Sequence, residues 1–106
     1  MNLPQILDSL KNDAQFRHNL TTWHTIPPKP ANWAPFPDSL NPKLVASLKN
    51  RGISQLYTHQ SSAIEASLNH ENVCVVTPTA SGKTLCYNAP ILNRLMENPN
   101  ARALYL

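Results

Sequence analysis

A glycine, a lysine and a threonine stand together at residues 82–84, directly after a short apolar run. That run, residues 73–76, is rich in valine, as is typical of a buried strand in a parallel sheet. After it, apolar side chains recur at roughly helical spacing, at Leu85, Ala89, Leu92, Leu95 and Met96. A strand that turns through Gly-Lys-Thr into a helix is the arrangement by which proteins bind the phosphates of a nucleoside triphosphate.

Each residue type in this turn has a use in phosphate chemistry. Backbone N–H groups and the positive end of the following helix stabilise an anion. The side chain of Lys83 would reach the β- and γ-phosphates, and the Thr84 hydroxyl would ligate Mg²⁺. Gly82 lets the backbone approach the phosphate closely. The predicted phosphate loop comprises Thr79, Ala80, Ser81, Gly82, Lys83 and Thr84, of which Lys83 and Thr84 are the predicted catalytic residues.

The strict phosphate-loop pattern G-x-x-x-x-G-K-[ST] is not met, because Thr77 stands where the pattern has its first glycine. A Gly-Lys-Thr triplet alone is a weak signal. The alternative is a generic strand, turn and helix that contains the triplet by chance. The flanking strand and helix patterns favour the nucleotide site, since this motif requires both.

A second candidate, Gln60, lies 22 residues before Gly82. Its amide carries one donor group and one acceptor, which matches the donor and acceptor that adenine presents together. Alone, a glutamine at a helix start is usually a solvated surface residue, but beside a phosphate loop it could select ATP over GTP. Tyr57 either packs beside the base or ribose or is a core aromatic. His59 is interpreted as a helix-start residue without chemistry.

The N-terminal part of the chain predicts helical and extended segments. Apolar residues at helical spacing predict a short helix over residues 3–11, whereas residues 13–25 fit a helix or an irregular segment. Six of the ten prolines lie within residues 27–42, which predicts an extended arm. Trp33 and Phe36 in this arm are expected to pin it onto a domain surface.

The remaining residues predict alternating helices and strands. Asn41 is the expected N-cap of a helix that runs from Pro42 to about residue 50, with Gly52 in its C-terminal turn. Thr58 is the expected N-cap of a helix over residues 59–68. The side chains expected to be buried are Leu44, Val45 and Leu48 in the first helix and Ala63, Ile64 and Leu68 in the second.

Strands are predicted at residues 73–77 and 102–106, separated by a long helix that residues 98–100 stop. The fold class is therefore α/β. The predicted division is an N-terminal helix and proline-rich arm over residues 1–40, followed by the start of a nucleotide-binding domain over residues 41–106.

Composition bounds the function classes. A chain of 106 residues forms at most one small domain, and its formal net charge of +3 is compatible with nucleic acid without indicating it. Cys74 and Cys86 do not form a zinc-site pattern and are predicted to be packed thiols, which fits a reducing cytoplasm. No apolar run approaches a membrane span, and the N-terminus lacks a signal-peptide pattern, so a soluble cytoplasmic chain is expected.

Two features predict that the chain is one part of a longer protein. It stops within the predicted strand at residues 102–106, and no acidic pair follows the phosphate loop. Hydrolysis of a nucleotide needs a carboxylate near the metal and a group that orients the attacking water. Alone, the chain is therefore expected to bind a nucleotide without hydrolysing it.

Together these motifs resemble the first RecA-like domain of superfamily 2 DEAD/DEAH-box helicases. The string T-P-T-A-S-G-K-T at residues 77–84 resembles motif I of that group, in which Thr or Ala commonly replaces the first glycine. Residues 52–60, with Gln60, resemble its Q motif. The strings R-G-I-S-Q-L-Y-T-H-Q, T-P-T-A-S-G-K-T-L-C-Y and A-R-A-L-Y-L, with the proline arm, resemble the YprA/MrfA-like branch of DNA-repair helicases.

The resemblance implies an incomplete RecA-like phosphate-loop NTPase domain with ATP and Mg²⁺ as ligands. Gln60 and Tyr57 would lie at the base, residues 79–84 would bind the phosphates, and Thr84 would ligate the metal. The strand at 73–77 would pair with strands beyond residue 106, and the two predicted strands would not pair with each other. The remainder of the protein would supply the acidic motif, arginine fingers and contacts to single-stranded or forked DNA.

The resemblance thus implies a 3′-to-5′ DNA helicase whose oligomeric state the sequence does not indicate. Several alternatives stay open. An RNA helicase is one, because tracking along a single strand need not read bases. A phosphate-loop enzyme such as a nucleotide kinase is another, although no arginine-rich lid is evident. The last is a non-catalytic nucleotide-binding fragment that docks on a partner through its proline arm.

Overall fold

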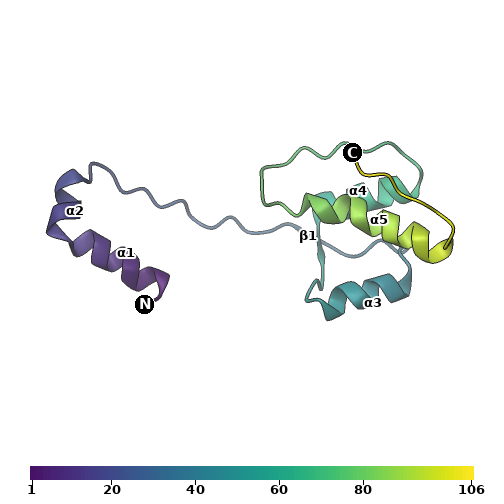
Figure 1. Cartoon of the computed structure of the whole chain (residues 1–106), viewed down its shortest axis with the longest axis horizontal. Helices are drawn as coiled ribbons and strands as arrows, with labels where there is room; N and C mark the ends of the chain where they lie inside the picture. The colour runs from purple at the N-terminus through teal and green to yellow at the C-terminus, as the bar shows by residue number, and fades with distance from the viewer.

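The computed structural model describes all residues from 1 to 106 and is mainly helical. An extended N-terminal part leads into a three-helix body, and the whole measures 64 × 28 × 24 Å (Figure 1). The elements in chain order are α1 (Leu3–Asn12), α2 (Ala14–Asn19), β1 (Trp33–Ala34), α3 (Pro42–Asn50), β2 (Leu56–Tyr57), α4 (Thr58–Leu68) and α5 (Lys83–Glu97). No helix combines the length and the apolar character that crossing a membrane requires.

The N-terminal part is a pair of short helices on an extended tether. Asn2 caps α1, since its side chain accepts from the N–H of Gln5 at 3.1 Å. The side chain of Gln5 in turn accepts from the N–H of Asn2 at 2.9 Å. Asp13 caps α2 by accepting from the N–H of Phe16 at 2.7 Å, without a returning side-chain bond. The helix predicted over residues 3–11 is confirmed, and residues 13–25 combine both options, with α2 followed by irregular chain. Neither helix buries a residue.

The proline-rich arm is extended, as predicted, and contacts the body through both of its aromatic residues. Trp33 pairs with Tyr57 in a two-stranded antiparallel sheet, β1 with β2, and the two rings stack with centroids 4.8 Å apart. Phe36 packs against the apolar core. The N–H of Thr58 also donates to the Asn32 carbonyl at 3.0 Å. The arm is thereby attached at the N-terminal end of α4.

The body is built from α3, α4 and α5 around one apolar cluster. Asn41 caps α3 by accepting from the N–H of Lys43 at 2.9 Å, and Gly52 ends the turn at a φ of 86°, as predicted. Helices α4 and α5 lie against each other, with α3 beside them (Figure 1). The cluster comprises Leu40, Leu44, Leu48, Leu56, Ile64 and Ala89. Val45 and Leu68, predicted to be buried, are half-buried at its margin.

The predicted N-cap of α4 is wrong by one residue. Tyr57 is the cap and Thr58 is the first helical residue. The reason is Gln60, whose Oε1 accepts from the N–H of Tyr57 at 2.9 Å and so fixes the helix start one residue earlier. At the other end of the body, α5 ends before Asn98, as predicted.

The two predicted strands at residues 73–77 and 102–106 are not strands in this structure. Both segments run without regular secondary structure, and Val76 is 89% exposed. A β-strand exists only where a neighbour completes its hydrogen bonds, and a parallel neighbour comes from a crossover connection. Neither segment has such a neighbour, and the two do not pair with each other, as the resemblance implied. The only sheet is the two-stranded pair β1 and β2.

Candidate functional site

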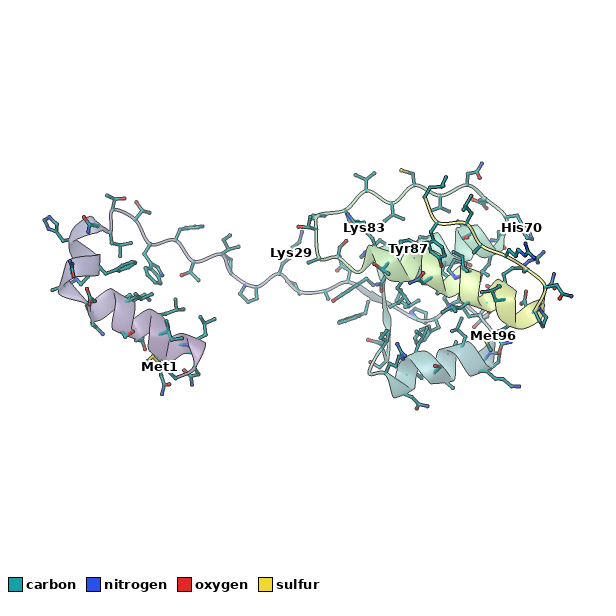
Figure 2. All side chains as sticks on the ribbon, viewed as in Figure 1. Met1, Lys29, His70, Lys83, Tyr87 and Met96 are labelled. Atoms are coloured by element: carbon teal, nitrogen blue, oxygen red, sulfur yellow. The ribbon has the colours of Figure 1, made fainter.

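The predicted phosphate loop lies at the N-terminal end of α5. The chain after α4 arches over α4 and α5 and returns to α5 at Lys83 (Figures 1 and 2). Gly82 is the N-cap residue in a left-handed conformation, with a φ of 74°. Thr79, Ala80, Gly82 and Thr84 are exposed, while Ser81 and Lys83 are half-buried. All six predicted loop residues therefore lie together at one end of a long helix.

Two hydrogen bonds join Thr77, at the start of the turn, to Ser81 and Lys83. The ammonium group of Lys83 donates to the carbonyl of Thr77 at 2.9 Å. The hydroxyl groups of Thr77 and Ser81 are hydrogen-bonded to each other. Lys83 thus points back toward Thr77, the position at which the strict phosphate-loop pattern has its first glycine. A phosphate oxygen would be a stronger partner for the ammonium than a neutral carbonyl.

The start of α5 offers backbone donors to a ligand. The N–H groups of Gly82, Lys83 and Thr84 donate to no group of the chain. These groups are the donors that a helix start leaves without an intrahelical partner. They carry the positive end of the helix dipole, so an anion is favoured there.

Gln60 joins α4 to the loop. Its side chain is 6% exposed, its Oε1 accepts from Tyr57 N–H, and its Nε2 donates to the Gly82 carbonyl at 2.9 Å. The amide retains one further N–H and one further lone pair. The structure therefore brings Gln60 to the phosphate loop, as the 22-residue spacing suggested. Its role toward adenine stays a prediction.

Gly82 is required here by two features of the structure. A Cβ atom at this position would lie 2.5 Å from Nε2 of Gln60 and 3.9 Å from Tyr57. Its φ of 74° also lies in the region that side chains disfavour. Ala80 takes a similar φ of 59° without a glycine's freedom. The close approach of Gln60 is thus a second reason for glycine at this position, beside the expected approach of a phosphate.

An aromatic stack, which the sequence analysis missed, borders the site. The ring of Tyr57 stacks on the ring of Trp33, with centroids 4.8 Å apart, and on the ring of His59, with centroids 5.7 Å apart. Both interplanar angles are small. His59, interpreted from sequence as without chemistry, places its Nε2 2.8 Å from the Ser81 carbonyl. The available signal was position, because His59 precedes Gln60 in the same helical turn and faces the same loop.

A cavity of about 1140 Å³ is lined in part by Lys83 and Thr84. It is bounded by α5 and by the chain that arches over it, and Cys86 and Tyr87 also line it. Gln60 and Tyr57 do not line it, so this space is separate from the predicted base site. Burial raises the pKa of the Cys86 thiol, which therefore stays protonated at neutral pH.

Comparisons with known proteins all find helicases. The DEAD/DEAH box helicase family model matches residues 57–106. The chain is 45% identical, over 94% of its length, to the uncharacterised ATP-dependent helicase YprA of Bacillus subtilis, of which it covers 13%. It is 27% identical, over 98% of its length, to the ATP-dependent helicase HRQ1 of Saccharomyces cerevisiae, of which it covers 9%.

A solved structure that is similar to this chain is also that of a helicase. The DUF1998 helicase MrfA, crystallised with DNA and AMPPNP, matches the whole of this chain with a TM-score of 0.79 and 42% identity. The chain covers 14% of that protein. The chain thus corresponds to about one seventh of the length of YprA and of MrfA.

Proposed function

We propose that this chain is the ATP-binding N-terminal part of a DNA helicase. The premise is its family, because the chain belongs to the DEAD/DEAH box helicases, in the branch of YprA and MrfA. The mostly helical structure, which matches MrfA, would be part of a RecA-like domain. The relatives' names describe ATP-dependent helicases, and MrfA was crystallised with DNA. The activity of the longer protein, its action on single-stranded or forked DNA and a role in repair are parts of this proposal.

The observation that carries the proposal is the junction between α4 and α5. Lys83 and three unpaired N–H groups lie at the start of α5, and buried Gln60 reaches the loop from α4. In the proposed site, the N–H groups of Gly82, Lys83 and Thr84 bind phosphate oxygens, and Lys83 exchanges the Thr77 carbonyl for a phosphate. The hydroxyl of Thr84, which is exposed, ligates Mg²⁺.

The base lies, in this proposal, beside Tyr57 and Gln60. Tyr57 is half-buried and presents a stacked ring between Trp33 and His59. The remaining N–H and lone pair of Gln60 would contact the donor and acceptor of adenine. Mg²⁺ neutralises phosphate charge when it is bound, while the residues described here bind and orient the nucleotide. The groups that activate water would come from the longer protein.

Family membership bears on each of the alternatives that the sequence left open. A nucleotide kinase is set aside, because the family match is to helicases. An RNA substrate is less favoured than DNA, because MrfA, the solved relative with 42% identity, was crystallised with DNA. A fragment that binds a nucleotide without hydrolysing it remains compatible with the 106 residues by themselves.

Lys83→Ala tests the proposal. We expect the chain to bind Mg²⁺-ATP in calorimetry, to bind GTP at least tenfold more weakly, and to lose ATP binding in the variant, because the lysine supplies the cation at the phosphates. In a chimera where this chain replaces the matching segment of YprA, the same substitution should abolish DNA strand separation. Tight ATP binding by the folded variant would overturn the assignment.

A further inference from the structure

Two neighbouring side chains of α4 hold two consecutive carbonyl groups of the phosphate loop. His59 lies 2.8 Å from the Ser81 carbonyl through Nε2, and Gln60 Nε2 lies 2.9 Å from the Gly82 carbonyl. A carbonyl oxygen only accepts, so His59 carries its proton on Nε2 and donates it. The proposed function uses Gln60 but assigns nothing to His59.

Peptide geometry connects these contacts to phosphate binding. A trans peptide unit is planar, and its C=O and N–H groups point in opposite directions. The chain has no cis peptide bond. The Ser81 carbonyl shares its plane with the N–H of Gly82, so turning that carbonyl toward α4 turns the N–H away from α4. The N–H of Gly82 is one of the three donors that have no acceptor within the chain.

The ring of His59 is itself held in place. It stacks on Tyr57 with an interplanar angle of 8°, and Tyr57 stacks on Trp33 with an angle of 15°. Trp33 belongs to β1, which pairs with β2 immediately before α4. The side chain of His59 is half-buried. Its donor is thus placed before any ligand arrives, which reduces the ordering that binding would otherwise require.

We infer that His59 is a positioning residue for nucleotide binding: by holding the Ser81 carbonyl, it orients the Gly82 N–H toward a phosphate oxygen. This inference rests on the proposed ATP-binding function. Loss of the hydrogen bond alone lets the peptide between Ser81 and Gly82 rotate. Binding of ATP must then fix the orientation of that peptide, and the lost conformational freedom weakens the affinity.

Three variants separate the hydrogen bond from the ring. His59→Phe keeps an aromatic ring on Tyr57 and removes the donor. His59→Gln removes the ring but keeps an N–H at a similar reach from the backbone. His24→Phe is the matched control, because His24 is exposed in irregular chain before the proline arm. Mg²⁺-ATP binding to each 106-residue chain is measured by calorimetry, and each melting temperature by circular dichroism.

We expect His59→Phe to weaken ATP binding about fivefold, the effect of one lost hydrogen bond, at an unchanged melting temperature. His59→Gln should bind within about twofold of the unsubstituted chain, and His24→Phe should match it. Equal ATP binding by His59→Phe overturns the inference and leaves the proposed function intact. A role in packing alone, shown by weak binding and a lowered melting temperature in both His59 variants, also overturns it. An unsubstituted chain that binds no ATP overturns the proposed function instead.

Discussion

Gly82 and Gln60 depend on each other at the scale of single residues. The glycine has a positive φ and no side chain, and the glutamine amide occupies the space that a Cβ would need. The amide in turn holds the Gly82 carbonyl, while its oxygen holds the start of α4. Because both ends of a buried amide are paired, removal of either partner leaves a polar group without a hydrogen bond, which is costly.

Gly82→Ala is therefore predicted to weaken ATP binding by about tenfold or more, since it combines a disfavoured φ with displacement of Gln60. Ala80→Gly is the matched control in the same loop. Its φ of 59° already suits glycine, and the gain is offset by the greater freedom of glycine in the unfolded chain. Calorimetry should find ATP binding by Ala80→Gly within about twofold of the unsubstituted chain. Similar affinities for both variants would contradict this account of Gly82.

At the scale of elements, Asn93 joins α5 to the start of α3. Its side chain is 1% exposed, its Oδ1 accepts from the N–H of Asn41 at 2.7 Å, and its Nδ2 donates to Glu97 at 3.1 Å. Asn41 is also the residue that caps α3. One buried amide thus sets how α5, which begins at the phosphate loop, lies against the helix that follows the proline arm.

Asn93→Ala is predicted to lower the free energy of unfolding by about 2 kcal/mol, because it leaves the N–H of half-buried Asn41 without an acceptor and opens a small void at the buried amide. Urea denaturation followed by circular dichroism measures the change. Arg94→Ala, at the exposed neighbouring position, should change the free energy by less than about 0.5 kcal/mol. Equal effects of the two substitutions would show that the buried amide does not join the helices.

At the scale of the whole molecule, the chain has one packed body and one outlying pair of helices. α1 and α2 contact each other, but neither contacts the body, and neither buries a residue. The arm between them and α3 first contacts the body near Asn32 and Trp33. The stability of the body should therefore be independent of the first two helices.

Deletion of residues 1–26 is predicted to change the free energy of unfolding of the body by less than about 0.5 kcal/mol. Deletion of residues 1–36 removes Trp33 and Phe36 as well. It should destabilise the body by roughly 2 kcal/mol or more, because aromatic packing and β1 are lost. Urea denaturation compares the two deletions. A large loss from the shorter deletion would mean that α1 or α2 packs on the body in solution.

Local patterns were sufficient for most of the elements. The cap at Asn41, the stop at residues 98–100 and the helical spacing in α3, α4 and α5 predicted helices at nearly their observed bounds, and the prolines predicted the extended arm. These signals act within a few residues, so the sequence alone carries them. The triplet Gly-Lys-Thr and Gln60 likewise predicted which residues would form the proposed nucleotide site, and the structure places Gln60 against Gly82.

Tertiary structure decided what depends on distant partners. Residues 73–77 and 102–106 have the composition of strands but are not strands here, because pairing requires a neighbour that apolar residues alone do not supply. Likewise, the contact of His59 with the Ser81 carbonyl and the stacking of Trp33 on Tyr57 join residues 22 or more positions apart, so only folding could establish them. Sequence determined which groups can bind phosphate, and the packing of α4 against α5 decided which way their donors point, because a planar peptide turns its N–H opposite to a carbonyl that is held.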